Sequence, residues 1–114
     1  MKTDLNYLRE MSGEDPGLMS EMIDIFKEQV VEMEAEMQAL YDNGDYSSLG
    51  KLAHKAKTSV AIMGMDNLAK QLKDLEIQSK EGINVNNYQS FIDNFRNETK
   101  EAIIELTNFR KKLS

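Results

Sequence analysis

The stretch YQSFIDNFRNETKEAIIELTNFRKKL, residues 88–113, carries the clearest structural pattern in the sequence. Its apolar and small side chains recur in alternating steps of four and three residues, at Tyr88, Ile92, Phe95, Thr99, Ala102, Leu106, Phe109 and Leu113. Because an α-helix has about 3.6 residues per turn, this spacing places all of these side chains on one side of a helix. The stretch therefore predicts a long amphipathic helix with one buried face.

Three earlier segments repeat this helical period, and a shorter helix, from about Asp4 to Met11, is expected before them. The apolar stripes of the three segments are Met19, Met22, Phe26, Val30, Met33, Met37 and Leu40; Leu49, Leu52, Ala53, Ala56, Val60 and Met63; and Leu68, Leu72, Leu75 and Ser79. Methionines at these spacings are expected in a core rather than in a promiscuous binding groove.

Capping and turn residues separate the long segments. Asp15 is suited to cap a helix that begins at Pro16. The sequence Asn43-Gly44-Asp45 combines a glycine that ends one helix with an aspartate that caps the next. Gly64 interrupts one apolar pattern before the next begins, and residues 82–87 form the longest loop.

These boundaries predict an all-α fold. We expect residues 1–114 to form a single domain, an antiparallel up-down four-helix bundle with a short extra N-terminal helix as a lid. The chain has one proline and few clusters of β-branched residues, so a sheet is not expected.

The composition restricts the chemistry. The chain contains no cysteine and one histidine. Disulfides, thiol nucleophiles, iron–sulfur sites and multi-histidine metal sites are therefore excluded. We expect no metal site and no cofactor bound by this chain itself.

The charge restricts the partners. The formal net charge is −6, with −9 in residues 1–50 and +3 in residues 51–114. No nucleic-acid partner is expected, because such binding needs a basic footprint, and the acidic run Glu28–Glu36 is interpreted as a solvated face. No apolar run approaches the roughly 18 residues of a membrane span, and no signal peptide is evident, so a cytoplasmic protein without membrane contact is expected.

The single histidine, His54, is expected on the outside of its helix. At about 100° of turn per residue, His54 lies about 140° from the centre of its apolar stripe. Small residues surround it on the helix surface and lysines flank it. We expect five residues around His54 to form a partner-facing surface: Gly50, Lys51, Lys55, Thr58 and Ala61. Such a strip would let another protein approach the imidazole closely, although an exposed histidine can also be an incidental, solvated residue.

The following helix offers His54 a partner. His54 and Glu76 lie at similar distances from Gly64, so in an antiparallel pair they sit at the same height to within about one turn. A carboxylate accepting from Nδ1–H would fix the tautomer and leave Nε2 as the free lone pair, an arrangement that suits a nucleophile. Lys57, one turn on, could balance the charge of a phosphoryl group on that nitrogen. A metal site built on His54 and Glu76 would lack suitable ligands.

Residues 52–64, LAHKAKTSVAIMG, resemble the phosphoacceptor motif of histidine-containing phosphotransfer (HPt) domains. In that motif Ala-His is followed by Lys three residues after the His, then usually by Gly and Ser, and by a Gly ten residues after the His. The resemblance extends to Leu68, Leu72, Leu75 and Glu76 and to the opening pattern of residues 8–16, and so covers nearly the whole chain.

The resemblance implies a phosphorelay intermediate. His54 would accept a phosphoryl group from the aspartyl phosphate of one receiver domain and pass it to another receiver's aspartate. Lys57 matches the family's phosphate-facing lysine, Glu76 matches a position that often bonds the imidazole, and Gly64 matches the glycine at the turn into the next helix. Thr58 departs from the pattern, since many members have glycine there. This departure affects which partners can approach His54 and how fast the phosphoryl group is transferred.

The resemblance also implies a phosphocarrier rather than an enzyme. The sequence has no Gly-rich nucleotide loop, so no autonomous kinase activity is expected. The expected partners are response-regulator receiver domains, a hybrid sensor histidine kinase, or both, with Mg²⁺ held by the receiver. The chain itself is expected to be a monomer. Its lysines around His54 would favour docking on a receiver's acidic pocket.

Two other functions compete with this interpretation. The first is a helical adaptor, an inactive relative in which His54 is incidental. The second is the dimerisation and phosphoacceptor domain of a sensor kinase. That domain resembles a two-helix hairpin with an acidic residue after the histidine and a proline soon after. Here Lys55 follows the histidine, and no proline lies beyond Pro16.

Overall fold

Five α-helices and one short 3₁₀ helix make up the secondary structure of residues 2–113, the part of the chain that this computed structural model describes. They are α1 (Asn6–Ser12), α2 (Pro16–Asp42), α3 (Tyr46–Ile62), α4 (Asp66–Glu81), η1 (Val85–Asn87) and α5 (Tyr88–Leu113). These residues contain no strand, which confirms the predicted all-α fold. None of these helices combines the length and the apolar composition that crossing a membrane requires.

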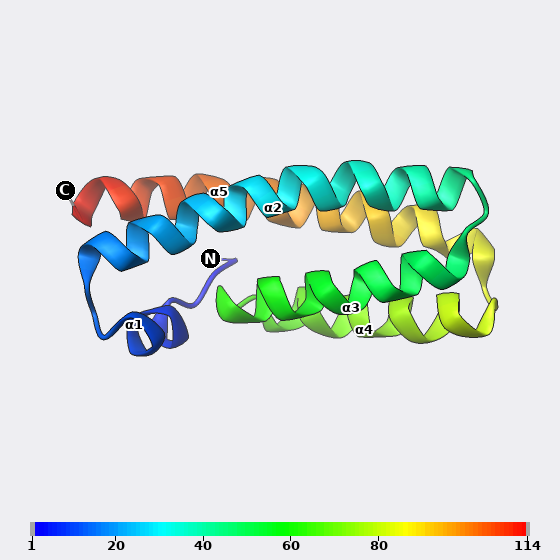
Figure 1. Cartoon of the computed structure of the whole chain (residues 1–114), viewed down its shortest axis with the longest axis horizontal. Coiled ribbons are helices and arrows are strands. Elements are labelled where there is room, and N and C mark those ends of the chain that lie inside the picture. The colour runs from blue at the N-terminus through cyan, green and yellow to red at the C-terminus, as the bar shows by residue number, and fades with distance from the viewer. Residues whose placement is uncertain (1, 114) are drawn as a thin grey trace.

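The four long helices form an antiparallel bundle made of two pairs of unequal length (Figure 1). α2 and α5 have 27 and 26 residues and span about 40 Å, whereas α3 and α4 have 17 and 16 residues and span about 25 Å. α2 and α5 therefore extend past the α3–α4 turn at one end of the molecule. The short helix α1 lies in the space that remains there (Figure 1). Its Leu8 is fully buried.

The N-terminal caps that the sequence predicts for α2 and α3 are both present. The Asp15 carboxylate accepts hydrogen bonds from the backbone N–H groups of Gly17 at 2.9 Å and Leu18 at 3.3 Å, ahead of Pro16 in the first turn. Asp45 accepts from the Ser48 N–H at 3.2 Å. These contacts satisfy backbone donors that a helix leaves unpaired at its start, which is why α2 and α3 begin where they do.

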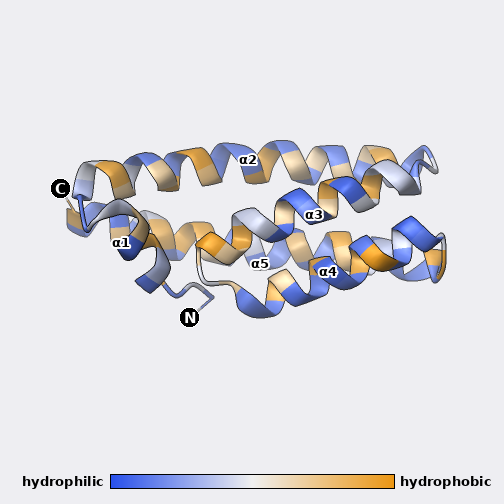
Figure 2. Cartoon of the chain, turned by 60° about the horizontal axis from the view of Figure 1, so that its bottom comes forward, coloured by the Kyte–Doolittle hydropathy of each residue, from blue (hydrophilic) through white to orange (hydrophobic). Residues whose placement is uncertain are grey.

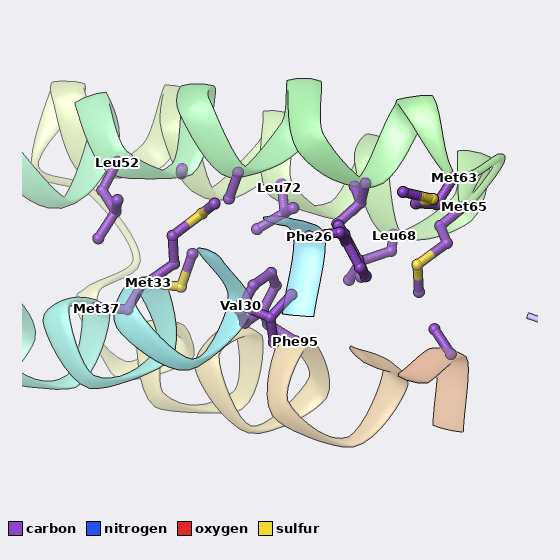
Figure 3. Packing of buried hydrophobic residues seen from close by; sticks show 14 of the residues in the cluster. Phe26, Val30, Met33, Met37, Leu52, Met63, Met65, Leu68, Leu72 and Phe95 are labelled. Carbon is purple, nitrogen blue, oxygen red and sulfur yellow. The ribbon is translucent and has the colours of Figure 1, made fainter. Parts of the chain in front are cut away.

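The core lies between the two pairs of helices. Hydrophobic and hydrophilic residues alternate in bands along each helix (Figure 2), and the hydrophobic bands face inward. Side chains of α2, among them Phe26, Val30 and Met33, reach toward α3, α4 and α5 (Figure 3). Four of the five methionines of these stripes are core residues, as predicted: Met19, Met33, Met37 and Met63 are buried. Met22 is only partly buried and packs at the edge of the core.

The turn between α3 and α4 depends on Gly64. This residue has φ +73°, a conformation that glycine adopts without a steric penalty. The N-terminal segment crosses directly over it, so a Cβ atom at Gly64 would collide with the backbone of Asp4. The Asp4 N–H donates to the Met63 carbonyl at 3.1 Å, and Thr3 bonds Glu105 of α5. Gly64 thus allows Thr3 and Asp4 to join α5 to the α3–α4 turn.

Candidate functional site

His54 projects from the outer surface of α3, in the middle of that helix. Its side chain is 59% exposed, while Ala53 and Ala56 beside it are fully buried against the core. This placement agrees with the orientation expected from the helical period. A core role for the histidine is therefore excluded.

Glu76 of α4 contacts the His54 ring, as their similar distances from Gly64 predicted. The Nδ1 atom lies 3.1 Å from both Glu76 Oε1 and Glu76 Oε2. An ionised carboxylate can only accept hydrogen bonds, so Nδ1 carries the hydrogen and donates it. Nε2 consequently holds the lone pair, and it has no hydrogen-bond partner among residues 2–113.

The Glu76 carboxylate lies at the centre of a small ionic cluster. Its side chain is only 12% exposed, and the Lys80 Nζ atom donates to its Oε2 at 2.9 Å. The Lys57 Nζ atom lies 3.6 Å from its Oε1. The Lys80 hydrogen bond lowers the pKa of Glu76 to about 2, with the contact to His54 adding to the effect and burial opposing it. Glu76 is therefore charged throughout the physiological range.

Lys80 was not among the residues that the sequence predicted for this site. A signal for it exists, because Glu76 and Lys80 have the i, i+4 spacing, with the glutamate first, that favours an ion pair on a helix. That spacing is common on exposed helices and does not by itself point to a functional site. Lys80 belongs to this one only because Glu76 also faces His54.

The prediction that Gly50 faces a partner protein is wrong. Gly50 is buried against α4, where a Cβ atom would lie 2.9 Å from the Lys80 Cγ atom and 3.2 Å from the Glu76 carbonyl oxygen. The helical-wheel argument considered the side of α3 that faces the bundle centre and left out the side that faces α4. The absent side chain instead lets α3 and α4 approach each other closely.

The other residues assigned to the partner-facing surface are exposed. These are Lys51, Lys55, Thr58 and Ala61. Thr58, at the position that departs from the motif, directs its hydroxyl to its own helix and donates to the His54 carbonyl oxygen at 3.4 Å. The Thr58 side chain nevertheless remains exposed one turn from the imidazole.

Two shallow grooves adjoin this surface and meet at Thr58 and Ile62. One, of about 570 Å³, lies between α2 and α3 and has mainly apolar walls that include Met22, Ile25 and His54 itself. The other, of about 720 Å³, lies between α1 and the α3–α4 turn. Its walls include Tyr7, Glu10, Lys57 and Ala61. The sequence did not predict either groove.

This arrangement presents one oriented nucleophile. Nδ1 is occupied by Glu76, so an electrophile approaching from solvent meets the lone pair of Nε2. No three His, Cys, Asp or Glu side chains within residues 2–113 are grouped as a metal site would require. The chemistry that the site supports is attack by Nε2 on a group presented by another molecule.

In a comparison with protein-family models, residues 21–107 match the family described as "Hpt domain". The matched region runs from α2 into α5 and includes the whole ionic cluster around Glu76, while α1 lies before it. No match was found among curated proteins or among solved structures.

Proposed function

This chain belongs to the Hpt-domain family, and on that premise we propose that His54 carries a phosphoryl group between receiver domains. Hpt domains act in phosphotransfer in two-component signalling, and they are phosphocarriers rather than enzymes. They interact with response-regulator receiver domains and with kinase domains. In this proposal His54 accepts the group from an aspartyl phosphate of one receiver and passes it to an aspartate of another.

The observation that carries the proposal is the contact between the His54 Nδ1 atom and the Glu76 carboxylate. It holds the ring in the tautomer whose Nε2 lone pair faces solvent. An incidental surface histidine would have no need of a carboxylate that is itself 12% exposed and held by a lysine. The contact therefore supports a nucleophile more than it supports a solvated residue.

The transfer step needs no proton movement on this chain. The Nε2 lone pair attacks phosphorus, the bond from phosphorus to the aspartyl oxygen breaks, and the aspartate leaves as a carboxylate. Because Nδ1 keeps its hydrogen, the phosphorylated ring carries a positive charge, which the Glu76 carboxylate stabilises from 3.1 Å. In the second transfer the acceptor aspartate attacks phosphorus, the N–P bond breaks, and the neutral imidazole is restored.

Positioning and charge balance carry most of the catalysis in such a reaction, because its transition state is loose and in line. The receiver would contribute its aspartate and its Mg²⁺. This chain would contribute an imidazole fixed on a helix and the charge of Lys57, whose Nζ atom already lies beside Glu76. No nucleotide would be bound, so we propose no kinase activity of its own.

Apolar contact area and positive charge around His54 support a receiver domain as the partner. The groove between α2 and α3 offers apolar contact area next to the imidazole, and Ile25 on its wall is 48% exposed. Lys51 and Lys55 are exposed on the same helix as His54. Positive charge here would steer the chain toward the acidic pocket that holds a receiver's aspartate. We propose that the chain does this as a cytoplasmic monomer.

The test is phosphotransfer to His54. Wild type and His54→Gln are incubated with a panel of phosphorylated receiver domains and, separately, with a small phosphoramidate donor. We expect an acid-labile, alkali-stable label on wild type alone, with the melting temperature of His54→Gln nearly unchanged because the side chain is exposed. A label that persists on His54→Gln would refute the proposal. A wild type that no donor labels would favour the helical adaptor instead.

A further inference from the structure

Lys80 is seated across the interface between α3 and α4. The space that Gly50 leaves open lies against the Lys80 side chain, since a Cβ atom there would come within 2.9 Å of Cγ. With its Cγ atom next to Gly50, the Lys80 side chain places its Nζ atom 2.9 Å from Glu76 Oε2, a distance typical of a charge-assisted hydrogen bond. The close contact between the two helices thus directs Lys80 to the Glu76 oxygen.

Lys57 is held much more loosely. Its Nζ atom lies 3.6 Å from Glu76 Oε1, which is an ion pair without a hydrogen bond. Lys57 also lies on α3, one turn after His54, on the helix that presents Nε2. Of the two lysines beside Glu76, one is bonded to the carboxylate and the other is only near it.

From this difference we infer that Lys80 is a positioning residue: it holds the Glu76 carboxylate in place and so leaves Lys57 free to serve the phosphoryl group. This inference rests on the proposed function. In the free protein, two ammonium groups face one carboxylate. When a phosphoryl group is attached to Nε2, it brings additional negative charge to the His54 side of the cluster. Lys57 then turns toward it, while Lys80 keeps Glu76 paired and aligned with Nδ1–H.

A double-mutant cycle tests whether the two lysines work in this linked way. Lys80→Met removes the charge and keeps a side chain of similar length, and with Lys80 gone Glu76 draws Lys57 to itself. We expect transfer rates to fall by about tenfold in Lys57→Met and by about fivefold in Lys80→Met. The double variant should lose only about ten- to twentyfold, because Lys57 already serves poorly once Lys80 is removed. Two residues acting independently would instead multiply to about fiftyfold, and that result would overturn the inference.

Two further variants separate positioning from a general effect of charge. Lys80→Arg keeps a donor within reach of Glu76 and should transfer at close to the wild-type rate. Lys73→Met removes a charge from the same helix, and Lys73 makes no hydrogen bond or ion pair within residues 2–113. Its rate should also stay near that of wild type. An equal loss in Lys73→Met and Lys80→Met would show that only the net charge matters, which contradicts the inference.

A second measurement follows the Glu76 carboxyl carbon by NMR through an acid titration, without any phosphorylation. The pKa of Glu76 is about 2, chiefly because of the Lys80 hydrogen bond. Lys80→Met should raise it toward its ordinary value, and Lys73→Met should leave it in place. If the Lys80→Met titration matched that of wild type, Lys80 would not hold Glu76 and the inference would fail. If instead no phosphoryl donor labelled wild type, the proposed function would fail, whereas the titration would still report whether Lys80 holds Glu76.

Discussion

The two pairs of helices in this bundle are held together by different means. α3 and α4 pack most closely of all, across Gly50, and the carboxylate between them is 12% exposed. α2 and α5 are joined by large core side chains and by polar contacts at their surface, such as the ion pair between Arg110 and Asp24 at 2.7 Å, both more than 40% exposed. The difference teaches where chemistry can be placed. A shielded charge acts strongly on its neighbour, whereas exposed charges are screened by water.

The first prediction removes core volume from the α2–α5 side of the bundle. Phe95 on α5 is fully buried, and Phe95→Ala should lower the free energy of unfolding by about 3–5 kcal/mol. Chemical denaturation measures this loss. Because Phe95 lies in the core on α5 and His54 lies on the exposed side of α3, the folded fraction should still accept a phosphoryl group at the wild-type rate. A slower transfer rate per folded molecule would show that packing between α2 and α5 also affects the reactivity of His54.

The second prediction forces α3 and α4 apart. Gly50→Leu adds a side chain where even a single carbon would lie 2.9 Å from Lys80 and 3.2 Å from the Glu76 backbone. Overpacking of this kind costs about 1–3 kcal/mol, so the stability loss should be smaller than for Phe95→Ala.

Transfer, however, should fall more in Gly50→Leu than in Phe95→Ala, because the contact between His54 and Glu76 spans the widened interface. Denaturation and transfer assays on the same two variants provide the comparison. If Gly50→Leu transferred at the wild-type rate, close packing of α3 and α4 would not be what aligns the ring.

The third prediction concerns acid and has the smallest effect. The pKa of Glu76 is about 2 in the folded protein and lies at its ordinary, higher value when the chain unfolds. The charged carboxylate therefore stabilises the fold above about pH 5, and this contribution disappears as the pH falls toward 2. Wild type should melt a few degrees above Glu76→Gln at pH 7.

That gap should close between about pH 5 and pH 2, as followed by circular dichroism. Glu34→Gln serves as a control, since Glu34 pairs with Arg96 between α2 and α5, where both side chains (27% and 42% exposed) are more accessible to water than Glu76 at 12%. Its melting temperature should differ little from that of wild type at any pH. A gap for Glu76→Gln that did not change with pH would mean that its charge contributes nothing to the fold.

Much of the fold followed from the sequence, because helical periods and caps are local properties. The stripe in residues 88–113 and the caps at Asp15 and Asp45 depend on neighbours within one or two turns, and α5, α2 and α3 begin where these signals indicate. The contact between His54 and Glu76 was also predictable. A short turn at Gly64 leaves few ways to align two antiparallel helices.

The parts that sequence reasoning missed depend on how the helices sit against one another. Gly50 was assigned to the solvent side because a helical wheel shows only which residues share a face, not which faces have neighbours. Lys80 needed the same information, because its i, i+4 spacing from Glu76 matters only where Glu76 faces His54 across the α3–α4 interface. The two grooves beside Thr58 arise from the placement of α1 and α2, which no local pattern specifies.

The short turn between α3 and α4 has a consequence for how the site forms. His54, Lys57, Glu76 and Lys80 all lie on one helical hairpin, and its two helices are separated only by Met63, Gly64 and Met65. Closing so small a loop costs little chain entropy, whereas joining α2 to α5 brings together distant parts of the sequence. We therefore expect this hairpin to form early in folding. The arrangement of these four side chains would then form within one contiguous stretch of chain. Packing against the longer helices α2 and α5 would stabilise it afterwards.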